Sequence, residues 1–138
     1  EIGSGLVGSE MCIRDSLQRA AILMRNATSQ TVTEKEAKSQ INLAIADLRV
    51  AKEKSPQNSY IYYNLGCIYL NQKTYNPALE AFNKAIEYDS RLPEAYYNRG
   101  LIYLHQNDKN KAFADFSKAG QLGLYKAYAL MKKIGHKQ

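Results

Sequence analysis

Residues 60–71 read YIYYNLGCIYLN, and residues 94–105 read EAYYNRGLIYLH. The second stretch begins 34 residues after the first, and the similarity extends beyond both, with 13 identical pairs among the 34 aligned at this offset. Self-similarity at a fixed period of about 20–50 residues indicates a repeat architecture, in which each unit buries its apolar face against its neighbours. The chain therefore contains at least two copies of one structural unit.

Within each unit the apolar residues have helical spacing. Four residues of the first copy lie at i, i+3, i+4 and i+7 on one face of a helix: Tyr62, Leu65, Gly66 and Tyr69. Three more lie at i, i+4 and i+7 on a second helix: Ala78, Phe82 and Ala85. Between the two helices, Asn76 is a candidate N-cap, and Pro77 suits the first turn of the second helix. Each unit is thus predicted to be a helical hairpin, in which a mid-helix glycine allows the two helices to approach closely.

The pattern resembles that of the tetratricopeptide repeat family, in which a helix with aromatic, Leu, Gly and Tyr positions precedes one with Ala, Phe and Ala. It recurs in the second copy at Tyr96, Arg99, Gly100, Tyr103, Ala112, Phe116 and Ala119. Tyr replaces the usual Trp of the family. Arg99 replaces Leu, and we expect its stem to pack and its guanidinium to reach water. The resemblance implies an all-α solenoid of about three helical hairpins plus a C-terminal capping helix.

The flanking segments resemble the repeat more weakly. Residues 33–54 are predicted to form a helix that begins with a capping box of Thr33 and Glu36, and residues 17–27 are its expected partner. The domain, residues 16–138, is expected to comprise an irregular first hairpin (16–56), two repeats (57–91 and 92–123) and a capping helix (124–138). The apolar residues expected to cover the end of the stack are Leu124, Tyr128, Met131 and Ile134.

Residues 1–15 are predicted to be foreign to the domain. Residues 6–16, LVGSEMCIRDS, resemble the in-frame translation of a transposase-type sequencing adapter, and residues 1–5 fit the index region upstream of it. The alternative is a genuine Gly/Ser-rich leader. Under the first interpretation Cys12 is not a biological thiol, and the natural sequence begins near Ser16 after an unknown length of missing chain. The compartment, cytoplasmic or periplasmic, therefore stays open.

The sequence lacks catalytic and metal-binding signatures. Its two histidines, His105 and His136, form no ligand pair, and there is no Cys-x-x-Cys motif, phosphate-binding glycine loop or nucleophile elbow. The acidic residues expected on exposed helix faces, as solubilising groups, include Glu80, Glu87, Asp108 and Asp115. We therefore predict a non-catalytic domain that uses no cofactor and no metal.

The family resemblance implies that the first helix of each hairpin lines a concave groove that holds a peptide. Four residues per unit lie beside the packed face of these helices, and we name them the groove strip: Tyr63, Asn64, Cys67 and Asn71, then Tyr97, Asn98, Leu101 and His105. Tyr offers stacking area and a hydroxyl, and Asn can donate to and accept from a peptide backbone. The alternatives are that both tyrosines only pack between helices, that Cys67 is a small buried apolar residue and that His105 is an ordinary polar one.

The primary prediction is thus a protein-interaction module with a protein or peptide partner. Family members that bind the C-terminal carboxylate of heat-shock chaperones use Lys, Arg and Asn, and Tyr63, Cys67 and Glu94 argue against that ligand here. The net charge of +6 and the five lysines after Asp115 leave electrostatic binding of nucleic acid or anionic membrane as an alternative. No nucleic-acid motif accompanies those lysines. A regulatory fragment of a larger enzyme is a further alternative, and the oligomeric state stays open.

Overall fold

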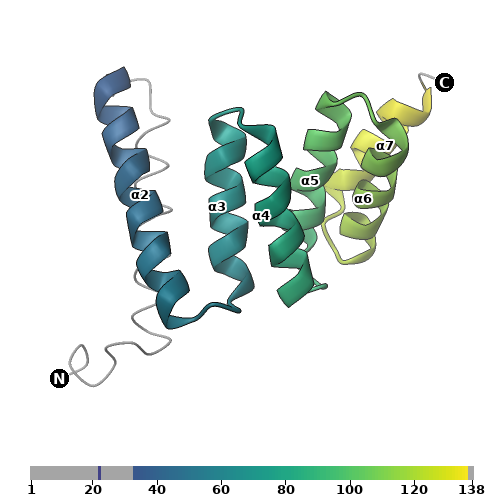
Figure 1. Cartoon of the computed structure of the whole chain (residues 1–138). Coiled ribbons are helices and arrows are strands. Elements are labelled where there is room, and N and C mark those ends of the chain that lie inside the picture. The colour runs from purple at the N-terminus through teal and green to yellow at the C-terminus, as the bar shows by residue number, and fades with distance from the viewer. Residues whose placement is uncertain (1–21, 23–32, 137–138) are drawn as a thin grey trace.

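The computed structural model describes residue 22 and residues 33–136. Over these residues the chain is helical, with no strand, and the helices lie side by side along the molecule (Figure 1): α2 (Glu34–Lys54), α3 (Ser59–Asn71), α4 (Tyr75–Tyr88), α5 (Pro93–His105), α6 (Lys109–Gln121) and α7 (Lys126–His136). Helix α3 packs on α4 and α5 packs on α6, each pair forming a hairpin. The predicted all-α helical-hairpin solenoid is confirmed. None of the described helices is long and apolar enough to cross a membrane.

The two hairpins turn in the same way. Lys73 and Asn107, which are 34 residues apart, both adopt left-handed backbone conformations, with φ values of 59° and 63°. The amide of the residue that follows each of them donates to a tyrosine carbonyl of the first helix, Thr74 to Tyr69 at 2.9 Å and Asp108 to Tyr103 at 2.8 Å. Asn tolerates this conformation better than Lys does. The repeat in the sequence is therefore also a repeat in backbone geometry.

The helix caps confirm one prediction and correct another. At the start of α2, the Thr33 hydroxyl accepts from the Glu36 amide at 3.3 Å and the Glu36 carboxylate accepts from the Thr33 amide at 3.1 Å, which is the predicted capping box. The prediction that Asn76 caps α4 is wrong, because the helix already begins at Tyr75 and its N-cap is Thr74. Pro77 lies in the first turn of α4, as expected.

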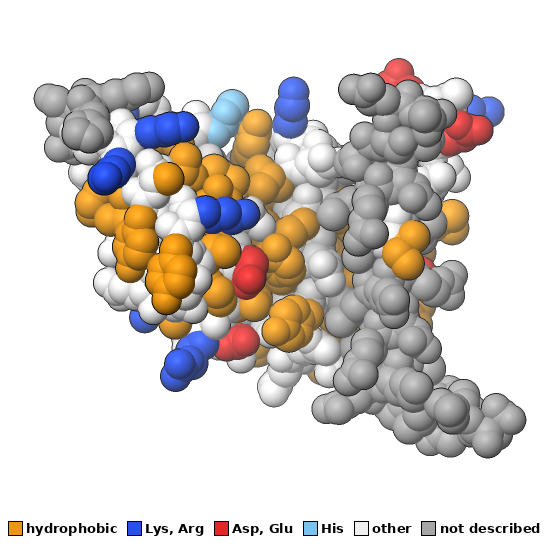
Figure 2. Space-filling view, turned by 180° about the vertical axis from the view of Figure 1, so that it is seen from behind, with side chains coloured by type: hydrophobic (Ala, Val, Ile, Leu, Met, Phe, Trp, Pro, Cys, Tyr) orange, Lys and Arg blue, Asp and Glu red, His pale blue; other side chains and the backbone are white. Residues whose placement is uncertain are grey.

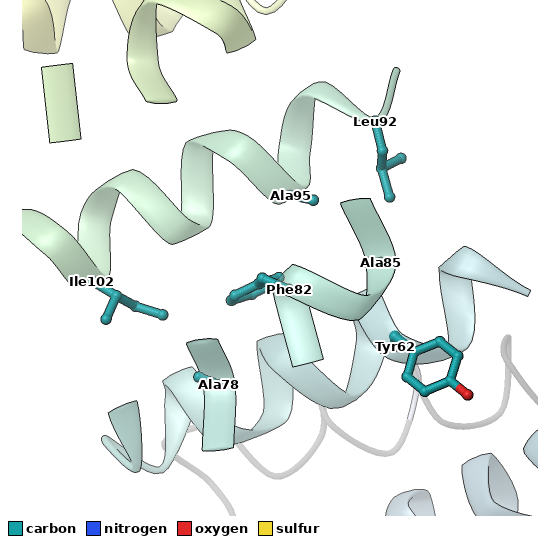
Figure 3. Packing of buried hydrophobic residues seen from close by; sticks show 7 residues of the cluster. All are labelled: Tyr62, Ala78, Phe82, Ala85, Leu92, Ala95 and Ile102. Carbon is teal, nitrogen blue, oxygen red and sulfur yellow. The ribbon is translucent and has the colours of Figure 1, made fainter. Parts of the chain in front are cut away.

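The core of each hairpin is a phenylalanine beneath a glycine. Phe82 and Phe116 are fully buried, and a Cβ atom added to Gly66 or Gly100 would lie 2.7 or 2.8 Å from the respective ring. This confirms the predicted close approach. Figure 3 shows how one cluster joins three helices, since its residues come from α3, α4, the loop before α5 and α5 itself: Tyr62, Ala78, Phe82, Ala85, Leu92, Ala95 and Ile102.

Arg99 and Asp115 depart from expectation. The guanidinium of Arg99 was expected in water and Asp115 on an exposed helix face. Instead, Asp115 is only 5% exposed, and the two side chains form a bidentate ion pair. Arg99 Nε and Nη2 each donate to an Asp115 carboxylate oxygen at 2.8 Å, and Nη1 donates to Asn83 Oδ1 at 2.9 Å. The carboxylate raises the pKa of Arg99 by hydrogen bonding to its charged form. The pair links α5 to α6, and Asn83 extends the link to α4.

The structure tests the predictions for the C-terminal end of the stack more fully than those for the N-terminal end. At the N-terminal end, α2 agrees with the predicted helix over 33–54, whereas its expected partner over 17–27 lies outside the described residues except for Ile22, which is helical. The leader, residues 1–15, also lies outside them. At the C-terminal end, Gly123 has a φ of 108° and precedes α7. Ile134 is buried there as predicted, but Tyr128 is 42% exposed.

Candidate functional site

Three residues of the groove strip come together where α3 and α5 meet. Asn98 of α5 extends its side-chain amide towards α3, where Nδ2 donates to the Tyr63 hydroxyl oxygen at 3.4 Å and to Cys67 Sγ at 3.6 Å. Asn98 is more than thirty positions from both residues in the chain, and the three form one polar cluster. We name Tyr63, Cys67 and Asn98 the inter-repeat cluster.

Both tyrosines of the strip combine packing with partial exposure. The Tyr63 ring lies 6.0 Å from that of Phe82, and the Tyr97 ring lies 5.6 Å from that of Phe116, both in tilted geometry. Tyr63 and Tyr97 are each half-buried. The alternative that these rings pack between helices is thus partly correct, because each ring packs against a core phenylalanine and is still partly exposed. Such tilted aromatic pairs also fix the ring positions.

Burial keeps the cluster in its uncharged form. Desolvation raises the pKa of Tyr63 far above its ordinary value, and the neighbouring Cys67 raises it further. Desolvation likewise raises the pKa of the Cys67 thiol, while hydrogen bonds from Tyr63 and Asn98 act in the opposite direction. The phenol and the thiol are therefore protonated at neutral pH. The cluster offers hydrogen bonds, not a nucleophile.

The other members of the strip occupy two different environments. Asn64 and Leu101 are half-buried and adjoin the inter-repeat cluster in the chain. Asn71 and His105 are exposed at the C-terminal ends of α3 and α5. The imidazole of His105 lies against the Tyr75 ring of α4, with ring centroids 4.2 Å apart and planes inclined at 26°. The strip therefore runs from a half-buried centre to an exposed polar end.

Three neighbours of the strip were not among the predicted site residues. Lys126 of α7 places its ammonium group 4.7 Å from the centre of the Tyr97 ring, and Glu94 is close enough to Tyr63 to raise its pKa further. Tyr75 supplies the ring beneath His105. The sequence contains a sign that the repeat continues into the helix of Lys126. The dipeptide Ala-Tyr occurs at 95–96 and again at 127–128, a separation two residues shorter than the 34-residue period.

One face of the molecule mixes exposed apolar and charged side chains. Figure 2 shows the face opposite to that of Figure 1: hydrophobic side chains are exposed over its middle and C-terminal parts, with Lys and Arg side chains among them and fewer acidic ones. No group of three or more His, Cys, Asp or Glu side chains that could hold a metal ion occurs within residues 33–136.

Comparison with known proteins identifies the repeats. A model described as TPR repeat matches residues 68–107, and a second, described as tetratricopeptide repeat, matches residues 93–123. A search of curated proteins finds no match.

Several solved structures are similar in fold. One is the first TPR domain of Spaghetti (RPAP3), bound to the HSP90 peptide SRMEEVD; it is 19% identical, with a TM-score of 0.66, over 87% of this chain and 93% of that one. The TPR domain of Arabidopsis OM64 is 19% identical, with a TM-score of 0.66, over 89% and 99% of the two chains. The O-GlcNAc transferase of Thermobaculum terrenum is 15% identical, with a TM-score of 0.74, over 93% of this chain but only 23% of its own. Together with the repeated hairpins described above, the matches show that residues 68–123 are tetratricopeptide repeats.

Proposed function

We propose that this protein is a non-catalytic interaction module that binds an extended segment of a partner protein along the groove strip. The observation that carries the proposal is the inter-repeat cluster, in which Asn98 reaches across two repeats to Tyr63 and Cys67. These contacts hold hydrogen-bonding groups of consecutive repeats at fixed positions, and a prearranged surface loses less entropy when a flexible ligand binds.

The atoms of the cluster suit a peptide backbone. Asn98 donates through Nδ2 to its neighbours, so its Oδ1 is the atom that accepts from a peptide N–H group. The Tyr63 hydroxyl oxygen, which accepts from Asn98, has a second lone pair that accepts from a peptide N–H group. Leu101, which is half-buried next to the cluster, contacts an apolar side chain of the ligand. A backbone-directed strip with one apolar contact favours an extended segment over a small molecule.

The charges around the strip favour a segment with little net charge. The HSP90 peptide bound by the Spaghetti domain, SRMEEVD, is acidic. Here the neighbours of the strip include one cation, Lys126 above the Tyr97 ring, and one anion, Glu94 near Tyr63. Because these charges oppose each other, an acidic ligand gains little Coulomb attraction. We therefore propose a near-neutral segment in place of a chaperone-type acidic terminus.

Selection from a random peptide library, with the whole chain as bait, tests the proposal. The selected peptide is then titrated calorimetrically against the parent, Leu101→Glu and, as a matched control, Leu43→Glu, which places the same charge on an exposed leucine of α2. We expect at least a tenfold rise in Kd for Leu101→Glu, about 1.4 kcal/mol, and no change for Leu43→Glu. Equal affinities in all three proteins would refute the site.

The lysines of α7 are the basis of the alternative function, electrostatic binding of nucleic acid. Lys126, Lys132 and Lys133 are exposed on α7, which carries no acidic residue. If nucleic acid is the ligand, affinity should fall steeply between low and physiological salt, since each neutralised phosphate releases counterions. Binding at the groove strip should depend only weakly on salt, because the strip is largely uncharged. Salt titrations of the selected peptide and of a nucleic acid therefore separate the two functions.

A further inference from the structure

A second surface lies at the C-terminal end of the stack, away from the groove strip. An open pocket of about 610 Å³ is formed between α6 and α7 and is lined by Phe113, Tyr128, Ala129, Met131 and Lys132. Phe113 and Tyr128 are 43% and 42% exposed, which is high for aromatic side chains that adjoin one another. Large apolar residues that share one exposed pocket are typical of an interaction surface.

The pocket lies beside a helix that corresponds to the first helix of a hairpin. Helix α7 packs on the preceding hairpin in the register of α5, because Ala127 and Ile134 are buried seven residues apart, as Ala95 and Ile102 are. The corresponding residues are thus separated by 32 positions. Helix α7 therefore stands as the first helix of another hairpin.

In the preceding hairpin, the equivalent face of the first helix is covered by the second helix. Helix α5 receives α6 through Tyr96, Arg99 and Gly100: Tyr96 shares a buried cluster with Phe116, Arg99 bonds Asp115, and Gly100 lies beneath Phe116. The residues 32 positions later are Tyr128, Met131 and Lys132, all three of which line the pocket. The pocket is therefore the place that a second helix would occupy, and it continues the interface between α5 and α6.

We propose that this pocket docks an amphipathic helix of a partner protein that carries acidic residues beside its apolar face. The apolar side of the pocket matches the helix pairing already present in the stack. The acidic character follows from charge, because Lys132 lines the pocket and none of its lining residues is acidic. This lysine also opposes a second copy of this chain as the occupant, since pairing α7 with α7 would bring two Lys132 side chains together.

The residue that stands at the glycine position of α7 indicates reversible docking. At Gly100 an added Cβ would lie 2.8 Å from the Phe116 ring, so only glycine permits that close packing. Lys132 occupies the corresponding place on α7 and holds an incoming aromatic ring further out. The docked helix consequently buries less surface than α6 buries on α5, as expected of an exchangeable partner rather than a permanent part of the fold.

The experiment uses a synthetic peptide of residues 74–90 with Lys84→Glu, labelled with fluorescein. This segment is the α4 helix, which packs on α3 as the proposed partner helix packs on α7, and the substitution makes it more acidic. Fluorescence anisotropy measures its binding to the whole chain at low salt. We expect saturable binding that weakens at least tenfold in Met131→Glu and in Lys132→Glu, while Leu43→Glu on α2 binds like the parent. Unchanged circular dichroism verifies that each variant folds.

Four results would overturn the proposal. The first is no binding at peptide concentrations up to about 1 mM, which corresponds to roughly 4 kcal/mol. The second is equal binding by the parent and both α7 variants. The third is loss of binding in Leu101→Glu instead, which would assign the peptide to the groove strip. The fourth is a concentration-dependent dimer in analytical ultracentrifugation that Met131→Glu abolishes, which would make a second copy the occupant. Failure here leaves the groove proposal intact, because Leu101→Glu tests that site separately.

Discussion

Removing either partner of the Arg99–Asp115 ion pair should destabilise the fold, whereas removing both together should not. The first repeat shows the apolar alternative: 34 residues earlier, the same two positions hold Leu65 and Ala81. Ala81 is buried and Leu65 half-buried, so an uncharged pair fits between these helices. The double variant Arg99→Leu/Asp115→Ala makes the second repeat match the first at this contact.

The magnitudes follow from burial and from the remaining bonds. Breaking a buried ion pair by removing one partner costs about 3–5 kcal/mol, because the other charge is left uncompensated. Arg99→Leu should lie within that range, since the Asp115 side chain is only 7% exposed. Asp115→Ala should cost less, about 2–3 kcal/mol, because the Arg99 side chain is 20% exposed and keeps its bond to Asn83. The double variant should lie within about 1 kcal/mol of the parent, since apolar replacement of such pairs is often neutral.

Urea unfolding followed by circular dichroism measures the four free energies of the cycle. The slopes must agree among the variants, because a changed slope would signal a loss of two-state unfolding. We expect an interaction energy of at least about 2 kcal/mol between the two positions. If the two single effects simply add to within about 0.5 kcal/mol, the ion pair does not couple α5 to α6 and the reasoning is wrong.

Three further predictions concern the core, the first cap and the thiol. Gly66→Leu should lower the free energy of unfolding by about 1–3 kcal/mol, because its side chain meets the buried ring of Phe82, and thermal unfolding measures this. Hydrogen bonds from the Thr33 amide and hydroxyl lower the pKa of Glu36. The stabilisation that they provide is present at neutral pH and is lost as the pH falls through that lowered pKa. The urea midpoint of Thr33→Ala should therefore change less between neutral and acidic pH than that of the parent. Burial raises the pKa of Cys67, so iodoacetamide should alkylate it at least tenfold more slowly in the folded chain than in urea, as followed by mass spectrometry.

Each of these predictions has a matched comparison. Gly135→Ala places a Cβ on α7 where no atom lies within 4 Å, so it should not destabilise, and equal loss in both glycine variants would contradict the packing argument. For the cap, a parallel acid response of parent and Thr33→Ala would show that the Thr33 hydroxyl does not contribute to the lowered pKa of Glu36. For the thiol, Cys12→Ser leaves Cys67 as the single cysteine, and equally fast alkylation in buffer and in urea would place Cys67 at the open surface.

The helical hairpins could be predicted because the repeat constrains both local and long-range structure. Glycine and phenylalanine recur at one spacing, and that spacing requires two helices to meet at Gly66 and Phe82. Arg99 and Asp115 were misplaced because each was read alone, as a charged residue that prefers water. The two residues indicate an ion pair only when they are considered together, because both charged replacements occur in the same repeat, at positions that are apolar in the other repeat.

The environment of the groove strip depended on contacts between repeats, which periodicity does not specify. The hydrogen bonds from Asn98 to Tyr63 and Cys67 join residues of different units, and the residue spacing within either unit does not predict them. The position of Lys126 over Tyr97 depended on a shift of two residues after the second hairpin, where the left-handed Gly123 precedes α7. The sequence therefore predicts candidate residues for the strip, but it does not predict the contacts that those residues make with other repeats.

Amide chemical-shift mapping with the library-selected peptide tests the central claim most directly. The ¹⁵N-labelled chain is titrated with the peptide, and shift changes are assigned to helices. We predict that the largest changes lie on α3 and α5, at Tyr63, Cys67, Asn98 and Leu101, with α2 unaffected. Changes that avoid α3 and α5, whether on α2, on the outer face of α4 or only on α7, would contradict the claim that this strip binds the partner.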